Sequence, residues 1–330
     1  MIQRRDYLFG AAAYALGLPR AGAARGPGRI HRVGVLRSAD QGLDRSWEEF
    51  VTELSRRGYV EGSNLVFESR RGEEFQPDRV HRLAAELAAS NVELIYTHMG
   101  TLGALAAKRA TQSIPVVFHG ASDPVSSGLV ASLSHPGGNL TGNASSIFDS
   151  FPKSLQFLAE AIGRNNIRIV EIYPVDARHT LPWFSKMDAA IAAVVAALGA
   201  KFEYAEVASV AEIEPLVKRL ARERADAAIL GNFPMSVAQR QWVAALFVEH
   251  RLASVGDPRD GFLLQYLPSS RQLSRKAAEY VDKILKGAKP SELPVEQVSI
   301  FELAINLKTA KAIGLRIPQS LLLRAEEVVQ

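Results

Sequence analysis

The chain has 330 residues, a formal net charge of +4 and no cysteine. This length predicts two domains, each large enough to bury its own core. The small, dispersed charge lacks the Lys/Arg-rich runs with interleaved aromatic residues that a nucleic-acid groove needs. The absence of cysteine excludes a disulfide framework, a thiolate metal site and a cysteine nucleophile. We therefore expect a globular protein that does not bind nucleic acid.

The N-terminal segment has the features of an export signal. Arg4 and Arg5 precede the apolar run Leu8–Leu18 and small residues that end at Ala23. About eleven apolar residues are too few to span a bilayer, which takes about 20, and the paired arginines resemble a twin-arginine signal. We predict that residues 1–28 are a signal peptide and that the mature protein is periplasmic, without a lipid anchor. The alternative is a basic start followed by a chance apolar stretch.

The first part of the mature chain alternates short apolar runs with helical patterns. Strands are predicted at 30–36, 65–69, 92–96 and 114–118, and helices at 47–57, 80–89 and 101–109, with another helix after Asp123 and Pro124. The runs are too short for helices and are rich in β-branched and aromatic residues. Strands that alternate with helices imply a parallel sheet with right-handed crossovers. We expect residues 29–142 to form a doubly wound lobe.

The same pattern begins again after Gly142. Strands are predicted at 167–173, 202–207, 227–230 and 252–255, and helices at 153–162, 183–198, 213–222 and 237–250. The tail is predicted to contain a strand at 262–267, a helix at 273–285 and an extended segment at 293–301. No charged, Pro-rich or Gly/Ser-rich linker separates the halves, so we expect short, structured connections between two lobes.

Candidate ligand-binding residues follow the predicted strands, because ligands of parallel sheets lie beyond the carboxyl ends of the strands. In the first lobe they are Ser38, Asp40, His98, Met99, Thr101, His119 and Asp123, and in the second lobe Asp176, Arg178, Asn232, Phe233 and Asp257. Backbone amides at the start of the helix after Met99, with the Thr101 hydroxyl, suit a carboxylate. Asp123 either balances a ligand ammonium or caps the following helix.

The sequence shows no established catalytic or metal-binding motif. Its histidines have no HExxH or paired metal spacing, and neither a GxSxG elbow nor a GxxxxGK[ST] loop is present. We interpret Pro136–Asn139 as a turn rather than a phosphate loop. We therefore predict no catalytic residue, no metal and no cofactor. The alternative is an enzyme that uses His98, His119 and Asp123, which lie at adjacent strand ends.

Four sequence blocks carry a family pattern. They are RRGYVEGSNLVFESR (Arg56–Arg70), GTLGALAAKRAT with the following IPVVFHGASDPVSSGLVASLSHPGGNLTG, AAEYVDKILKGAKPSELPVEQ (Ala277–Gln297) and FELAINLKTAKAIGLRIPQSLLLRAEEV (Phe301–Val328). In this order they resemble the ABC-transporter substrate-binding proteins of the group that includes tryptophan and tyrosine binders. The resemblance covers nearly all of the chain after Ile30.

The resemblance implies an α/β fold of two doubly wound parallel-sheet lobes joined by a multi-crossover hinge, as in type I periplasmic binding proteins. Residues 260–291 would return to the first lobe, and residues 292–330 would complete the second lobe that begins with 143–259. The protein would capture an amino acid or other small carboxylate between the lobes and deliver it to an ABC permease, and we expect a monomer. A ligand-sensing partner of a membrane signalling receptor is the other alternative.

The sequence departs from the resembled pattern at predicted ligand loops. His98 and Met99 replace small residues, and the segment Pro174–Arg178 replaces an Asn-Pro turn and adds a cation. We therefore do not transfer the aromatic-amino-acid specificity of the best-known members to this chain. Arg178 is a candidate for selecting a second carboxylate or a larger polar solute.

Overall fold

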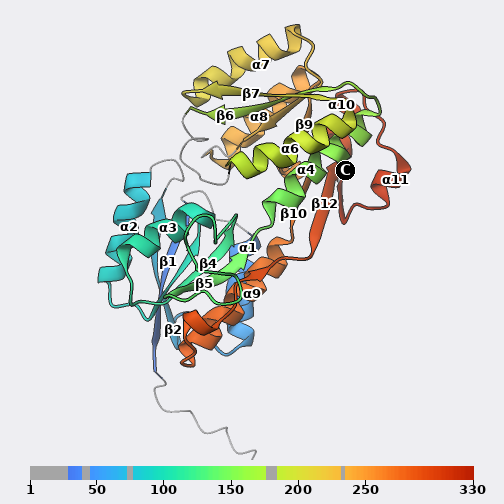
Figure 1. Ribbon diagram of the computed structural model, residues 1–330. Coiled ribbons are helices and arrows are strands. Elements are labelled where there is room, and N and C mark those ends of the chain that lie inside the picture. The colour runs from blue at the N-terminus through green and yellow to red at the C-terminus, as the bar shows by residue number, and fades with distance from the viewer. Residues whose placement is uncertain (1–28, 39–44, 73–76, 176–183, 232–234) are drawn as a thin grey trace, which may run out of the picture.

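The computed structural model describes residues 29–38, 45–72, 77–175, 184–231 and 235–330. They form two lobes, each built around a central sheet (Figure 1). The first sheet has six strands in the order β11-β5-β4-β3-β1-β2, and the second has seven in the order β13-β12-β10-β9-β8-β6-β7. Among these described residues, no helix is long and apolar enough to cross a membrane.

The first lobe is a three-layer α/β sandwich with an all-parallel sheet. Its strands are β1 (His31–Ser38), β2 (Leu65–Gly72), β3 (Leu94–His98), β4 (Val116–Ala121), β5 (Leu140–Ala144) and β11 (Glu296–Gln297); its helices are α1 (Arg45–Arg56), α2 (Pro77–Ala89), α3 (Gly100–Ala110), α9 (Ser270–Leu285) and the 3₁₀ turn η3 (Pro290–Glu292). Alternation along β1 sends Val33 and Val35 toward α1 and α9, and Leu36 toward α2 and α3.

The second lobe has the same three-layer plan. Its strands are β6 (Arg168–Pro174), β7 (Lys201–Val207), β8 (Ala227–Leu230), β9 (Ala253–Val255), β10 (Leu264–Pro268), β12 (Phe301–Asn306) and β13 (Glu327–Val329). Its helices are α4 (Ile147–Ile162), α6 (Phe184–Leu198), α7 (Ile213–Arg222), α8 (Val237–Glu249), α10 (Leu307–Ala312) and α11 (Gln319–Leu322), with 3₁₀ turns η1 (Val210–Glu212) and η2 (Pro258–Asp260). The pairing of β10 with β12 is antiparallel.

The described chain passes between the lobes three times, from β5 to α4, from β10 to α9 and from β11 to β12. The connections lie side by side, since Val298 N donates to Ala144 O at 3.3 Å and Ser269 N donates to Ile300 O at 2.8 Å. Ser146, in the first connection, has a left-handed backbone with φ of 49°. Short neighbouring connections of this kind form a hinge between two lobes.

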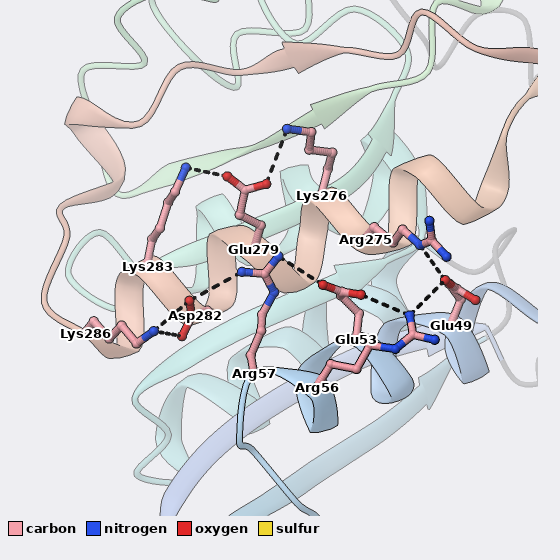
Figure 2. Close-up of polar contacts among 10 residues, drawn as sticks. All are labelled: Glu49, Glu53, Arg56, Arg57, Arg275, Lys276, Glu279, Asp282, Lys283 and Lys286. Atoms are coloured by element: carbon pink, nitrogen blue, oxygen red, sulfur yellow. Dashed lines mark hydrogen bonds and ion pairs between the residues drawn. The ribbon is translucent and has the colours of Figure 1, made fainter.

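Ion pairs join helices α1 and α9 on the outer face of the first lobe. α1 and α9 lie side by side although they are far apart in sequence, and ion pairs link them across their exposed faces (Figure 2). Arg275 Nε lies 2.6 Å from Glu49 Oε1, and Arg57 lies 3.6 Å from Asp282 and 3.0 Å from Glu53. The returning tail is therefore attached to the N-terminal part of the first lobe.

Several predicted elements differ from the structure. α4 begins at Ile147 instead of 153, because buried Pro152 is accommodated within the helix. Residues 124–128 form turns rather than the predicted helix: the Asp123 carboxylate accepts from Ser126 N as a cap would, but the left-handed backbone of Gly128, with φ of 67°, does not continue a helix. The strand β5, which follows the predicted turn at Pro136–Asn139, was not predicted.

The C-terminal part of the chain crosses between the two lobes at different residues from those predicted. We expected residues 260–291 in the first lobe, but β10 is hydrogen-bonded into the second sheet, between β9 and β12. Residues 292–330 were expected in the second lobe, whereas β11 pairs with β5 of the first sheet. The predicted signal peptide, residues 1–28, lies outside the described residues.

Candidate functional site

The carboxyl ends of β3 and β4 lie next to each other and point toward the second lobe (Figure 1). β3 ends at His98, and α3 begins at Gly100 with Met99 as its buried N-cap residue. Thr101 Oγ1 accepts from Ser122 N at 3.0 Å, which ties the first turn of α3 to the loop after β4. The structure therefore brings together His98, Met99, Thr101, His119 and Asp123, as the sequence predicted for adjacent parallel strands.

The two histidines form a buried pair. Their ring centroids lie 4.2 Å apart at an interplanar angle of 70°. His98 Nε2 lies 2.8 Å from Ser46 Oγ, and His119 Nδ1 lies 3.1 Å from the hydroxyl of Tyr96. Burial, and after it the nearby His98, lowers the pKa of His119 well below its usual value. His119 is therefore uncharged at neutral pH and offers hydrogen bonding rather than a counter-charge.

Three aromatic residues, Trp47, Phe50 and Tyr96, form a cluster next to this pair. The Phe50 ring stacks on Tyr96 at a centroid distance of 4.0 Å, and Trp47 lies 6.4 Å from Tyr96. The guanidinium of Arg37, which is only 3% exposed, lies 4.9 Å from the Trp47 ring centroid. We did not predict Arg37, Ser46 or Tyr96 as site residues. A charged residue that directly follows the buried run Val33–Leu36, near the carboxyl end of β1, is the signal that points to Arg37.

Asp123 connects the lobes. Its Oδ1 accepts from Ser126 N at 3.1 Å, and its Oδ2 lies 3.0 Å from Nζ of Lys186, in the first turn of α6 in the second lobe. Burial raises the pKa of Asp123, but hydrogen bonds from Ser126 and Lys186 outweigh burial and lower that pKa overall. The ion pair is therefore a direct contact between the two lobes. Sequence reasoning missed Lys186.

The second-lobe candidates are placed differently. Asp257 follows β9, and its Oδ1 accepts from Arg259 N at 2.9 Å, which caps η2. Arg259 also lies 3.4 Å from Asp257 Oδ2 and donates from Nε to Glu327 at 3.0 Å. Asp257 is therefore held within its own lobe. Ser38, half-buried, ends β1, the strand beside β3. Five predicted residues lie outside the described residues: Asp40, Asp176, Arg178, Asn232 and Phe233.

Two surface cavities lie away from these strand ends. One, of about 910 Å³, is formed by α7 and the end of α8, and its lining includes Glu214, Lys218, Arg222 and His250. The other, of about 160 Å³, lies beside Arg164 and Asp226. Neither contains a predicted ligand residue. Across the described parts of the chain, no three His, Asp or Glu side chains are grouped closely enough to hold a metal ion.

The two α/β lobes, the adjacent connections between them and the contact of the loop after β4 with α6 of the other lobe define a two-lobed architecture in which a ligand can bind between the lobes. The sequence model described as ABC transporter substrate binding protein matches residues 33–160 and 256–329, which is more than half of the chain. The chain belongs to this family of ABC transporter substrate-binding proteins. Because the family consists of binding proteins rather than enzymes, the catalytic alternative is rejected.

Individual relatives agree with this assignment. The tyrosine-binding protein of Clostridioides difficile (strain R20291) is 25% identical over 295 residues, which cover 83% of this chain and 78% of the relative. A conserved domain protein from Vibrio cholerae O1 biovar El Tor has a TM-score of 0.78 at 23% identity, over 91% of this chain and 100% of that one. An ABC domain from Streptococcus pneumonia in complex with L-Trp has a TM-score of 0.75 at 23% identity, with the same coverage. The predicted fold class is confirmed.

Proposed function

We propose that this protein is a periplasmic receptor that binds a small carboxylate-bearing molecule between its lobes and delivers it to an ABC permease. The observation that carries the proposal is the contact between the lobes, in which Asp123 of the loop after β4 lies 3.0 Å from Lys186 in the first turn of α6. Binding proteins close around a ligand at such a hinge. The relatives named for tyrosine binding and L-Trp complex formation support a ligand of this size.

The carboxylate of the ligand would bind at the start of α3. The first backbone N–H groups of a helix have no partner within the helix and carry the positive end of its dipole. Gly100 and Thr101 occupy this first turn, and the Ser122–Thr101 hydrogen bond holds the neighbouring loop against it. His119 lies beside the end of β3, where its ring packs against His98. It is only 8% exposed and uncharged, so it can offer a hydrogen bond to the ligand but no opposite charge.

Membership of the family supports delivery to a permease, which would distinguish loaded from unloaded receptors by their conformation. The N-terminal signal pattern supports export to the periplasm. We propose that the receptor acts as a monomer, which size-exclusion chromatography with light scattering will test.

A thermal-shift screen tests the binding function. The protein without its signal peptide is heated with amino acids, aliphatic and aromatic carboxylates, and neutral sugars as controls. A compound present at about one hundred times its dissociation constant adds about 2.7 kcal/mol to folding stability, which is readily visible. We expect stabilisation by a carboxylate that is recovered chemically unchanged. Stabilisation by the sugars alone, or conversion of the bound compound, would contradict the proposal.

A further inference from the structure

We propose that the ligand is a small carboxylic acid without an ammonium group, and that Lys186 enforces this choice. The inference rests on the proposed function and narrows its ligand class. An amino acid needs a carboxylate in the site to balance its ammonium. In this chain Lys186 Nζ already lies 3.0 Å from Asp123 Oδ2 and therefore takes that position.

Both oxygens of Asp123 have partners from the chain itself. Oδ1 accepts from Ser126 N, Oδ2 faces Lys186, and the side chain is 11% exposed. Lys186 is also held from a second side, because its Nζ lies 4.5 Å from the centroid of the Phe148 ring, at the start of α4. The Lys186 side chain is 60% exposed, and an ammonium-bearing ligand would have to displace it from Asp123.

The other described carboxylate of the predicted site is also balanced within the chain. Asp257 accepts from Arg259 N and lies 3.4 Å from the Arg259 guanidinium. Among the predicted site residues that the structure describes, both acidic side chains therefore have a cationic partner of their own. Neither of these two described carboxylates is therefore free to balance the ammonium of a zwitterion, and a desolvated charge without a counter-charge is costly. An anion that presents only a carboxylate does not incur this cost.

Calorimetric titration of the purified protein tests the inference with pairs of compounds that differ in the amino group. The pairs are L-tyrosine and 3-(4-hydroxyphenyl)propionate, L-leucine and 4-methylpentanoate, and L-glutamate and glutarate. We expect the amine-free member of at least one pair to bind the wild type at least tenfold more tightly. In Lys186→Met the preference should fall at least tenfold or reverse, because Asp123 becomes available to an ammonium.

Lys218→Met is the matched control, since Lys218 on α7 pairs with Glu214 in the outer part of the second lobe, and it should keep the wild-type preference. Lys186→Gln provides a second neutral variant. Tighter binding of the amine-bearing members to the wild type would overturn the inference while leaving the binding function intact. A preference unchanged by both Lys186 variants would overturn the role of Lys186. No binding by any of the six compounds would overturn the ligand class, and the broader thermal-shift screen then judges the proposed function separately.

Discussion

The two lobes share a plan but fix their strand ends by different means. In the first lobe, polar side chains hold the loops: Thr101 binds Ser122, Asn143 Oδ1 accepts from Gly120 N at 2.8 Å, and Tyr96 contacts His119. In the second lobe, glycines lie against aromatic rings. A Cβ on Gly256 would lie 2.6 Å from the Phe262 ring, and one on Gly231 would lie 2.3 Å from the Tyr173 ring. These first-lobe loops are thus held mainly by hydrogen bonds, whereas Gly231 and Gly256 of the second lobe are fixed by close packing on rings, beside the cap at Asp257.

This difference indicates that the two lobes contribute differently to the proposed ligand site. Polar groups that are already hydrogen-bonded at strand ends form a preorganised surface, which is what a ligand carboxylate requires. In the second lobe, the Tyr173 ring that packs on Gly231 also contacts Phe184, the first residue of α6, two residues before Lys186. The predictions below test this contrast between hydrogen bonding and packing.

Asn143→Ala should have the largest effect. The side chain is fully buried, accepts from Gly120 N and donates to Leu273 O at 2.8 Å, so it links the β4 loop to α9. Its removal leaves Gly120 N without this partner, at about 1 to 3 kcal/mol, and empties the space of a fully buried side chain, whereas Leu273 O lies within α9. We expect a loss of about 2 to 4 kcal/mol in urea unfolding. A loss below about 1 kcal/mol would contradict this account.

Gly256→Ala tests the packing of the second lobe. The added methyl group would lie within 3 Å of three atoms of the Phe262 ring, which is only 2% exposed and has little room to move. Overpacking of this kind costs about 1 to 3 kcal/mol, measured as a lower urea midpoint. Gly138→Ala, where no atom lies within 4 Å of the new Cβ, is the control. A midpoint unchanged by Gly256→Ala would refute the packing role.

The buried imidazole of His119 should make stability depend on pH. Its folded-state pKa lies well below the ordinary value of about 6.5. The unfolded chain therefore binds a proton that the folded state does not, and stability that is fully present above about pH 6.5 falls as the pH drops below it. We expect the free energy of unfolding to fall by about 1 kcal/mol for each pH unit below about pH 6.5. His119→Asn should remove this slope, whereas exposed His135→Gln should retain it.

The ion pairs between α1 and α9 should contribute least. Arg275 and Glu49 are 48% and 19% exposed, and exposed pairs are worth about 0.2 to 1 kcal/mol. We expect Arg275→Gln to lower stability within this range at low salt and by less in 0.5 M NaCl, as measured by urea unfolding. Lys289→Gln, at the more exposed pair with Glu292, is the control and should change little.

Most helices and strands were predictable from the sequence, because the spacing of apolar residues identifies them and glycine or proline marks their ends. It failed where local signals conflicted with tertiary contacts. β5, Leu140–Ala144, contains Thr141, Gly142 and Asn143 and looks like a turn, but its polar side chains are satisfied in the buried sheet by Leu293 O, Gly120 N and Leu273 O. α4 extends through Pro152 for a comparable reason, since burial outweighs the poor helix propensity of proline.

The candidate site was predictable in part. His98, Thr101, His119 and Asp123 could be predicted to lie together, because they follow neighbouring parallel strands whose carboxyl ends meet at the same edge of the sheet. The partners of these residues were not predictable, since the Lys186–Asp123 contact spans 63 residues and depends on how the lobes meet. Asp257 shows the converse, because it is placed at a strand end as expected but acts as a cap within its own lobe.

Hydrogen–deuterium exchange with the compound that gives the largest shift in the thermal screen tests the central claim most directly. Binding between the lobes predicts slower exchange in peptides that cover Thr97–Gly103, His119–Ser126 and the start of α6 around Lys186. Protection confined to α7 and the end of α8, around the cavity beside Lys218 and His250, would contradict it.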